Sequence, residues 1–272
     1  MPYVPNTILN LYEKFQDLLD RSKRSWLAAS TGTQEKDHKA KKNEAKFSSS
    51  CHQLGPLTSV FVKPAAVAVR RAESVTGVSS DGSRLIIWAD ASRKKTSTGF
   101  AVAFLTGSYW VRVTAKGQAT PTEVAELEAV CLALDYAVQV TKMQKENIDP
   151  LRSVEVFTDS QSALGLLKVT NRPMFTTGPH GNAQGDNPST KKGMRKRTTE
   201  KACAMIDELH KAGVMVELHW VPRGKVIGNV IADKGALMAR MGLASYHSPT
   251  DVLVEFLPAD ELQLNIRRCM IL

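Results

Sequence analysis

The order of strand-like and helical segments between residues 84 and 241 constrains the fold more than any other feature of this chain. Three apolar, strand-like runs come first, at residues 84–90, 98–106 and 109–117, and Gly107-Ser108 is typical of a tight turn between the last two. Helical and strand-like segments then alternate: helix 121–142, strand 153–159, helices 160–169 and 198–212, strand 214–221, and a helix from about Val226. This pattern predicts an α/β fold with a five-stranded mixed sheet, made of a three-strand meander and two further strands, and with helices on both faces.

Two aspartates stand where predicted central strands end. Asp90 closes the run LIIWAD, and Asp159 closes VEVFTD. Sheets of this kind bind ligands outside the carboxyl ends of their parallel strands, so both carboxylates are expected at the ligand-binding edge. Each also has a structural alternative, since Asp90 suits a turn and Asp159 suits a helix N-cap. These strand ends alone leave the choice open.

The long predicted helix carries a third candidate carboxylate. Its start, TPTE at 120–123, is typical of a capping box in which Glu123 bonds back to the backbone of Thr120. Glu126 has no such task and lies at the margin of the apolar face, whereas Glu128 points further out and is expected in solvent. Glu126 is therefore the candidate from this helix.

The last predicted helix carries the fourth. Its buried stripe is predicted to comprise Val230, Leu237 and Met241, and Asp233 falls at the edge of that stripe. Four carboxylates turned toward one buried margin would repel one another strongly. Divalent Mg²⁺ or Mn²⁺ relieves such repulsion, and two such ions suit phosphodiester hydrolysis. We therefore expect a metal site at this margin.

Four motifs in this order, WADAS, VAELEAV, VFTDSQSAL and GNVIAD, resemble the type 1 ribonuclease H family, in particular the domains of eukaryotic cells and retroelements. The resemblance covers about residues 84–241. It implies a ribonuclease H-like five-stranded mixed sheet, two Mg²⁺ ions for which Mn²⁺ can substitute, and endonucleolytic cleavage of the RNA strand of RNA–DNA hybrids. Carried onto this chain, it implies that the catalytic and metal-binding residues are Asp90, Glu126, Asp159 and Asp233.

A hybrid substrate requires cationic side chains around these carboxylates. The net charge of +9 favours a polyanionic partner, although a basic surface without such a partner is also compatible with it. A hybrid is held through its phosphates and distinguished by its 2′-hydroxyl groups. The candidate contacts, each of which can instead be a solvated or helix-starting residue, are Arg93, Lys94, Lys95, Arg223, Lys225, the cluster KKGMRKR at 191–197, Ser160 and Gln161.

The loop before the last helix departs from the family. Its members usually have Trp-x-Pro-Gly-His-x-Gly there, with a histidine that assists catalysis and product release, whereas this chain has WVPRGKVIGN. His219 precedes Trp220 within the strand and is expected to be structural. We therefore expect metal binding with retained but reduced activity, because neither Arg223 nor Lys225 exchanges a proton readily at neutral pH. The alternatives are a weak or inactive nucleic-acid-binding module, such as a retroelement remnant, and another nuclease or transposase with a preference for DNA duplex.

The flanks lie outside the resemblance. We expect an amphipathic helix at 1–29, a polar, largely disordered linker at 30–83, the ribonuclease H-like domain at 84–241 with a basic loop insertion at 171–199, and an extension at 242–272. That extension either packs on the sheet or ends a truncated larger polypeptide. No secretory signal or bilayer-spanning run is evident, and the four cysteines contain no CxxC pair. We expect an intracellular protein, nuclear or cytoplasmic, without a membrane partner.

Overall fold

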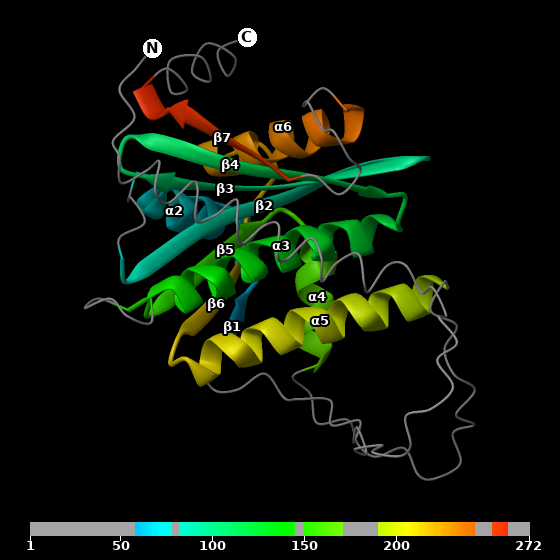
Figure 1. Cartoon of the computed structure of the whole chain (residues 1–272), viewed down its shortest axis with the longest axis horizontal. Coiled ribbons are helices and arrows are strands. Elements are labelled where there is room, and N and C mark those ends of the chain that lie inside the picture. The colour runs from blue at the N-terminus through cyan, green and yellow to red at the C-terminus, as the bar shows by residue number, and fades with distance from the viewer. Residues whose placement is uncertain (1–57, 78–81, 145–149, 171–189, 243–251, 261–272) are drawn as a thin grey trace, which may run out of the picture.

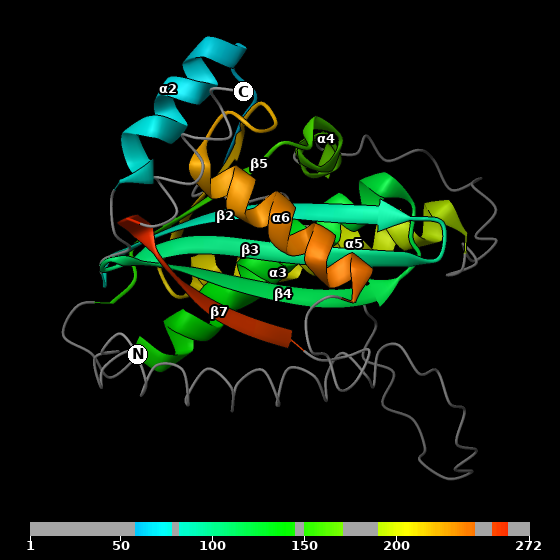
Figure 2. The ribbon, with the colours of Figure 1, turned by 90° about the horizontal axis from the view of Figure 1, so that it is seen from above.

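A computed structural model of the chain describes residues 58–77, 82–144, 150–170, 190–242 and 252–260. They form one seven-stranded mixed sheet with helices on both faces (Figures 1 and 2). The strand order is β1-β6-β5-β2-β3-β4-β7. The strands are β1 (Thr58–Phe61), β2 (Arg84–Lys94), β3 (Ser97–Thr106), β4 (Tyr109–Gln118), β5 (Ser153–Thr158), β6 (Met215–Trp220) and β7 (Val252–Pro258). The helices are α2 (Ala65–Thr76), α3 (Thr122–Met143), α4 (Gln161–Thr170), α5 (Lys191–Lys211) and α6 (Ile227–Met241).

The five central strands are those expected from the sequence. Strands β2, β3 and β4 form an antiparallel meander, and the β3–β4 turn places Thr106 opposite Tyr109 with Gly107 at a φ of 56°. Glycine suits that left-handed conformation because it has no Cβ. Strand β5 pairs in parallel with the other side of β2, and β6 pairs in parallel with β5. This order confirms the predicted α/β fold with a mixed sheet.

Strand β2 is buried on both faces. Leu85 and Ile87 belong to a core shared with α3, α4 and α5, whereas Ile86 and Trp88 belong to a second core shared with α2 and α6. Successive side chains of a strand point to opposite faces, so one strand serves both cores. Figure 2 shows α6 lying across the sheet on the face opposite α3 and α5. No helix within the described ranges combines the length and apolar character that crossing a bilayer requires.

The buried face of α6 differs from the predicted stripe. Leu237 and Met241 are 39% and 54% exposed, so the prediction that they lie in the core is wrong. The buried face instead consists mainly of small residues: Gly228, Asn229, Ile231, Ala232, Gly235, Ala236 and Ala239. Small side chains let the helix backbone approach the strands, and a Cβ atom at Gly99 of β3 would overlap the carbonyl oxygen of Ala236. A search for large apolar residues overlooks such a face.

Both edge strands lie outside the segment predicted to form the domain. Strand β1 and helix α2 occupy residues 58–76, so the prediction of a disordered linker is wrong for that stretch. Strand β1 has only four residues, and α2 buries only Ala68, Ala72 and Val75, which leaves a weak periodic signal. Strand β7 pairs with β4, which confirms for residues 252–258 that the C-terminal extension packs on the sheet. The predicted helix at 1–29 and linker residues 30–57 lie outside the described residues.

Helix α5 begins inside the predicted basic loop. The Oγ1 atom of Thr190 accepts a hydrogen bond from the backbone N–H of Gly193 at 3.1 Å, which caps the helix. The loop prediction of 171–199 is therefore wrong from Lys191 onward, and residues 171–189 lie outside the described residues. Lysine, arginine and methionine are good helix formers, so a basic run is compatible with a helix once a cap precedes it.

Helix α5 is held against α3 by the two glutamates that were not candidates for the site. Glu123 forms ion pairs with Lys191 at 3.0 Å and with Arg195, and Glu128 accepts a hydrogen bond from Thr198 at 2.9 Å. The predicted capping box is wrong, because Pro121 occupies the N-cap position and no side chain caps α3. The prediction that Glu128 is solvated is also wrong, since its carboxylate is largely covered by α5.

Candidate active site

The four predicted carboxylates come together at one edge of the sheet. The parallel register of β2 and β5 places Ala89 opposite Thr158, so the next residues, Asp90 and Asp159, lie side by side. Glu126 reaches them from the second turn of α3. One carboxylate oxygen from each of these three residues lies within 4.8 Å of the other two. Asp233, in the second turn of α6, stands at the rim of this group with its side chain 46% exposed.

Burial and mutual repulsion disfavour the charged forms of these acids. Burial, together with the negative charges of Asp159, Glu126 and Asp233, raises the pKa of Asp90 to about 9. The pKa of Glu126 is raised to about 8, again mainly by burial and then by the charge of Asp159. Burial also raises the pKa of Asp159, although the neighbouring Arg223 opposes the shift. Without a further cation, the surroundings therefore favour the neutral forms of Asp90 and Glu126.

Two oxygens of the cluster are buried without a hydrogen-bond donor among the described residues. Asp90 accepts a hydrogen bond through Oδ1 from the backbone N–H of Ala91 at 2.8 Å. Its Oδ2 atom, and Oε2 of Glu126, are buried with no amide, amino or hydroxyl donor among the described residues. Burying such oxygens without a partner costs free energy. Hard oxygen ligands at this spacing fit a divalent cation such as Mg²⁺ or Mn²⁺.

The loop between β6 and α6 places Arg223 over the carboxylates. Its Nε atom donates a hydrogen bond to Oδ2 of Asp159 at 2.8 Å. One terminal nitrogen of the same guanidinium lies 3.5 Å from Asp233 and 3.8 Å from Asp90. The sequence analysis assigned Arg223 to nucleic-acid phosphate and missed these three contacts. Two of the acids, Asp90 and Asp159, lie more than 60 residues away from Arg223 in the sequence, so no local pattern indicates the contacts.

The other predicted nucleic-acid contacts surround the cluster unequally. Lys94 shares the Asp90 face of β2 by strand alternation, while Arg93 lies on the opposite face, and both are exposed. Gln161 and Lys225 are also exposed near the cluster. Ser160 is buried, and its Oγ accepts a hydrogen bond from the backbone N–H of Ala163 at 3.2 Å. For Ser160 the structure favours the helix-starting alternative.

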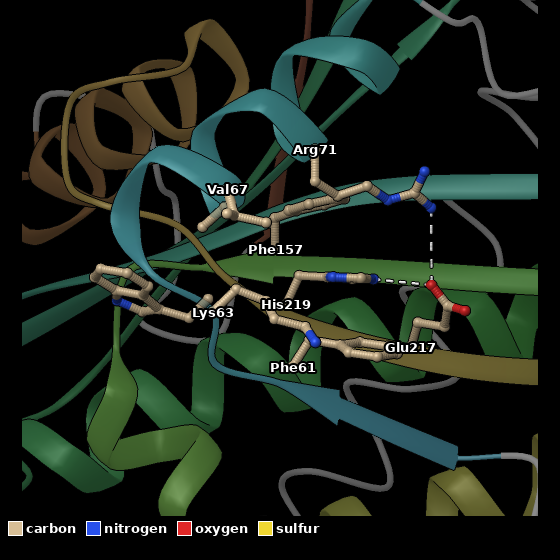
Figure 3. Close-up of a pocket in the computed structure, with 9 residues that line it drawn as sticks. Phe61, Lys63, Val67, Arg71, Phe157, Glu217 and His219 are labelled. Atoms are coloured by element: carbon tan, nitrogen blue, oxygen red, sulfur yellow. Dashed lines mark hydrogen bonds and ion pairs between the residues drawn. The ribbon is translucent and has the colours of Figure 1, made fainter.

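A second group with metal-ligand spacing, which the sequence did not suggest, lies on β5 and β6. Glu155, Glu217 and His219 each offer one ligand atom within 4.8 Å of the others. Glu217 and His219 also line a cavity of about 350 Å³ (Figure 3). Glu155 is already paired with Arg71 at 2.6 Å and with Arg84. Two arginines thus neutralise the group, in contrast to the cluster around Asp90.

His219 has the structural surroundings expected for it. Its ring is stacked between Phe61 and Phe157, with centroid distances of 4.7 and 4.8 Å, and its Nε2 atom lies 2.9 Å from Glu217. Burial lowers the pKa of His219, which favours the neutral ring. The alternation of SVEVF and VELHW was the signal that could have placed Glu155, Glu217 and His219 on one face of the sheet.

Comparison with known proteins gives distant structural similarities only. No protein-family model and no curated protein matches this chain. Ribonuclease H1 from the halophilic archaeon Halobacterium salinarum NRC-1 aligns with 17% identity and a TM-score of 0.39, over 57% of this chain and 96% of its own. The foamy viral protease-reverse transcriptase in complex with dsDNA aligns with 16% identity and a TM-score of 0.37, over 58% of this chain and 94% of its own.

The same foamy viral protein, in complex with an RNA/DNA hybrid, aligns with 13% identity and a TM-score of 0.38, over 78% of this chain but only 24% of its own. The fold of the chain is defined by its own strand order and register. It is an α/β fold with a mixed sheet, in which two strands, β1 and β7, are added at the edges of the five expected ones.

Proposed function

We propose that this protein is a metal-dependent endoribonuclease that cleaves the RNA strand of RNA–DNA hybrids. The observation that carries the proposal is the cluster of Asp90, Glu126 and Asp159. One carboxylate oxygen of each lies within 4.8 Å of the other two, and Oδ2 of Asp90 and Oε2 of Glu126 are buried without a hydrogen-bond partner among the described residues. Such a cluster is costly for the fold, and the neutralised group around Glu155 shows that the same sheet can pair its buried acids fully. A functional site accounts for the difference.

Asp90, Glu126, Asp159 and Asp233 would hold two Mg²⁺ ions, with Mn²⁺ able to replace them. Bound ions of this kind polarise a phosphoryl oxygen and lower the pKa of a water molecule for attack on phosphorus. The chain orients the ligands. The Ala91 N–H holds the Asp90 carboxylate, and the indole N–H of Trp220 donates to the backbone carbonyl of Asp159 at 3.0 Å. Half-exposed Asp233 leaves the cluster open toward a substrate.

The exposed residues around the cluster suit the phosphates of a hybrid. Lys94, Arg223 and Lys225 supply positive charge, and Gln161 offers an amide beside Asp159 for a sugar or phosphate oxygen. These groups bind a backbone without reading its bases, as shape-selective recognition of a hybrid requires. Because the loop has no histidine to exchange a proton near neutral pH, we expect turnover to be slow.

Cleavage of a labelled RNA–DNA hybrid tests this proposal. The protein is incubated with the hybrid and Mg²⁺ or Mn²⁺, beside Asp159→Asn and the control Glu200→Gln, an exposed acid on α5. We expect cleavage of the RNA strand by the parent and by the control, and a loss of about 100-fold or more in the Asp159→Asn variant. An intact hybrid, under conditions where the parent binds it, refutes the proposal.

A second candidate is a nucleic-acid-binding module without catalysis. It is favoured by Arg223, which places a permanent positive charge across three of the four carboxylates. This candidate predicts salt-sensitive hybrid binding that is the same in the parent and Asp159→Asn, with no cleavage by either. Cleavage of duplex DNA in preference to the hybrid would instead indicate another nuclease of the same fold.

A further inference from the structure

Arg223 sits where a cation is needed. Its guanidinium is within 4 Å of oxygens from Asp90, Asp159 and Asp233, which come from a strand, a strand end and a helix. These include Oδ1 of Asp90 and Oδ2 of Asp159, so the guanidinium competes with a divalent cation for these carboxylates, most directly for Asp159. Oδ2 of Asp90 and Oε2 of Glu126 have no hydrogen-bond partner among the described residues. A guanidinium and a metal ion cannot both bind one carboxylate lone pair.

The loop that carries Arg223 is anchored on both sides of it. Trp220 is tied to the Asp159 carbonyl, and the N–H of Gly224 donates to Oδ1 of Asn229 at 2.9 Å. Gly224 has a φ of 67°, a conformation that glycine adopts without strain. Asn229 is buried on the first turn of α6. The backbone on which Arg223 stands is therefore held near the cluster.

The side chain itself is free to leave. Arg223 is 64% exposed, so its long side chain can turn into solvent without breaking a packed core. An exposed ion pair contributes little to stability, and a divalent cation with direct ligand bonds competes with it effectively.

We propose that Arg223 is a built-in counter-ion that occupies the cation position of the metal-free protein and must be displaced before a divalent ion binds. This inference rests on the metal site of the proposed function. Arg223 thereby neutralises part of the charge of the acidic cluster when no metal is bound, and it lowers the apparent affinity for metal. Once displaced, its guanidinium remains at the rim of the site, where a substrate phosphate replaces the carboxylates as its partner.

Titration of the metal-free protein with Mn²⁺, followed by calorimetry or by electron paramagnetic resonance of free Mn²⁺, tests this inference without any substrate. The variants are Arg223→Gln, Arg223→Lys, the ligand variant Asp159→Asn and the matched control Lys225→Gln. Lys225 is an exposed cation in the same loop, and it makes no ion pair with any residue that the structure describes. Lys225→Gln therefore removes the same charge without removing a carboxylate contact.

We expect Arg223→Gln to bind Mn²⁺ about three- to fivefold more tightly than the parent. The change in Mn²⁺ affinity caused by Lys225→Gln should be less than about half of the change caused by Arg223→Gln. The affinity of Arg223→Lys should lie between those of the parent and Arg223→Gln, because an ammonium lacks the planar fork that spans several carboxylates. The melting temperature gives a second readout. In chelator, the melting temperature of Arg223→Gln should be lower than that of the parent. On addition of Mn²⁺, the melting temperature of Arg223→Gln should rise by more than that of the parent.

Three results would overturn the inference while leaving the metal site intact. These are equal Mn²⁺ affinities of the parent and Arg223→Gln, weaker binding by Arg223→Gln, or equal tightening by Lys225→Gln, which would indicate a general effect of charge. Failure of all the proteins to bind Mn²⁺ would refute the metal site itself, and with it the proposed function. The two failures are therefore distinguishable.

Discussion

Gly228 of α6 lies against the indole ring of Trp88 on β2, so closely that a Cβ atom on Gly228 would overlap the ring and come within 2.6 Å of its Cγ atom. Trp88 is fully buried and stacks on Phe157 with a centroid distance of 5.5 Å, so the ring has no room to retreat. The contact sets how near α6 approaches the sheet. It thereby positions Asp233, five residues further along the helix.

Gly228→Ala is expected to destabilise the protein. The added methyl group forces α6 away from Trp88, and overpacking of this kind costs about 1–3 kcal/mol of unfolding free energy. The matched control is Gly165→Ala on α4, where a Cβ atom would meet nothing within 4 Å. The control should gain about 0.5–1 kcal/mol from the better helix propensity of alanine. Urea unfolding measures both, and a Gly228→Ala variant as stable as the parent would contradict the contact.

Thr198→Val tests the attachment of α5 to α3. Thr198 is buried, and its hydroxyl donates to Glu128, so its removal should cost about 1 kcal/mol of unfolding free energy. Hybrid cleavage should not change, since neither residue belongs to the acidic cluster. The neighbouring Thr199→Val serves as the control in the same denaturant titration. Equal effects of the two substitutions would show that the hydrogen bond contributes nothing specific.

The stability of the metal-free protein should fall as the pH rises. Asp90 and Glu126 ionise in the folded protein at pKa values of about 9 and about 8, against ordinary values of 3.8 and 4.5. Between these limits the folded state binds more protons than the unfolded state, so protonation stabilises the fold and ionisation removes that stabilisation. In chelator, the melting temperature should therefore decrease from about pH 5 to about pH 9.

Asp90→Asn supplies the control for this pH dependence. The amide cannot ionise, so the variant should lose less stability than the parent over the same pH interval. Added Mn²⁺ should flatten the decrease in the parent, because a bound cation favours the ionised carboxylates. Identical pH profiles of the parent and Asp90→Asn, both measured in chelator, would show that Asp90 does not titrate as its burial implies.

The start of α5 is expected to contact nucleic-acid phosphate. Ion pairs between α5 and Glu123 place the start of α5 beside the start of α3, one turn before Glu126. Lys196, near the start of α5, is exposed. Lys196→Gln should weaken hybrid binding equally for different sequences and reduce the slope of log affinity against log salt by about 0.9. Lys211→Gln, at the far end of the same helix, should leave the slope unchanged. A slope unaffected by Lys196→Gln would remove α5 from the interface.

Local sequence patterns were sufficient to predict the central sheet and the clustering of the four carboxylates. Apolar runs located the five central strands. Asp90 and Asp159 lie side by side as predicted, because β2 and β5 are parallel neighbours in register. The predicted strand end at Asp90 is wrong, since pairing with β3 continues β2 to Lys94. Glu126 followed from its place at the margin of a long amphipathic helix. Periodicity and strand ends are properties of short segments, so they are visible without knowledge of what packs against them.

The remaining features depend on contacts between distant segments. The buried face of α6 could not be inferred from Val230, Leu237 and Met241. Small residues form that face because the helix lies close to Trp88 and Gly99, where larger side chains would overlap the sheet. Glu123 pairs with α5 instead of capping its own helix, and β1 and β7 are short strands defined by the edges they cover. The position of Arg223 among three carboxylates is of the same kind. The environment of Arg223 arises only when the chain folds, because the separation of charges in the sequence does not predict their distance in space.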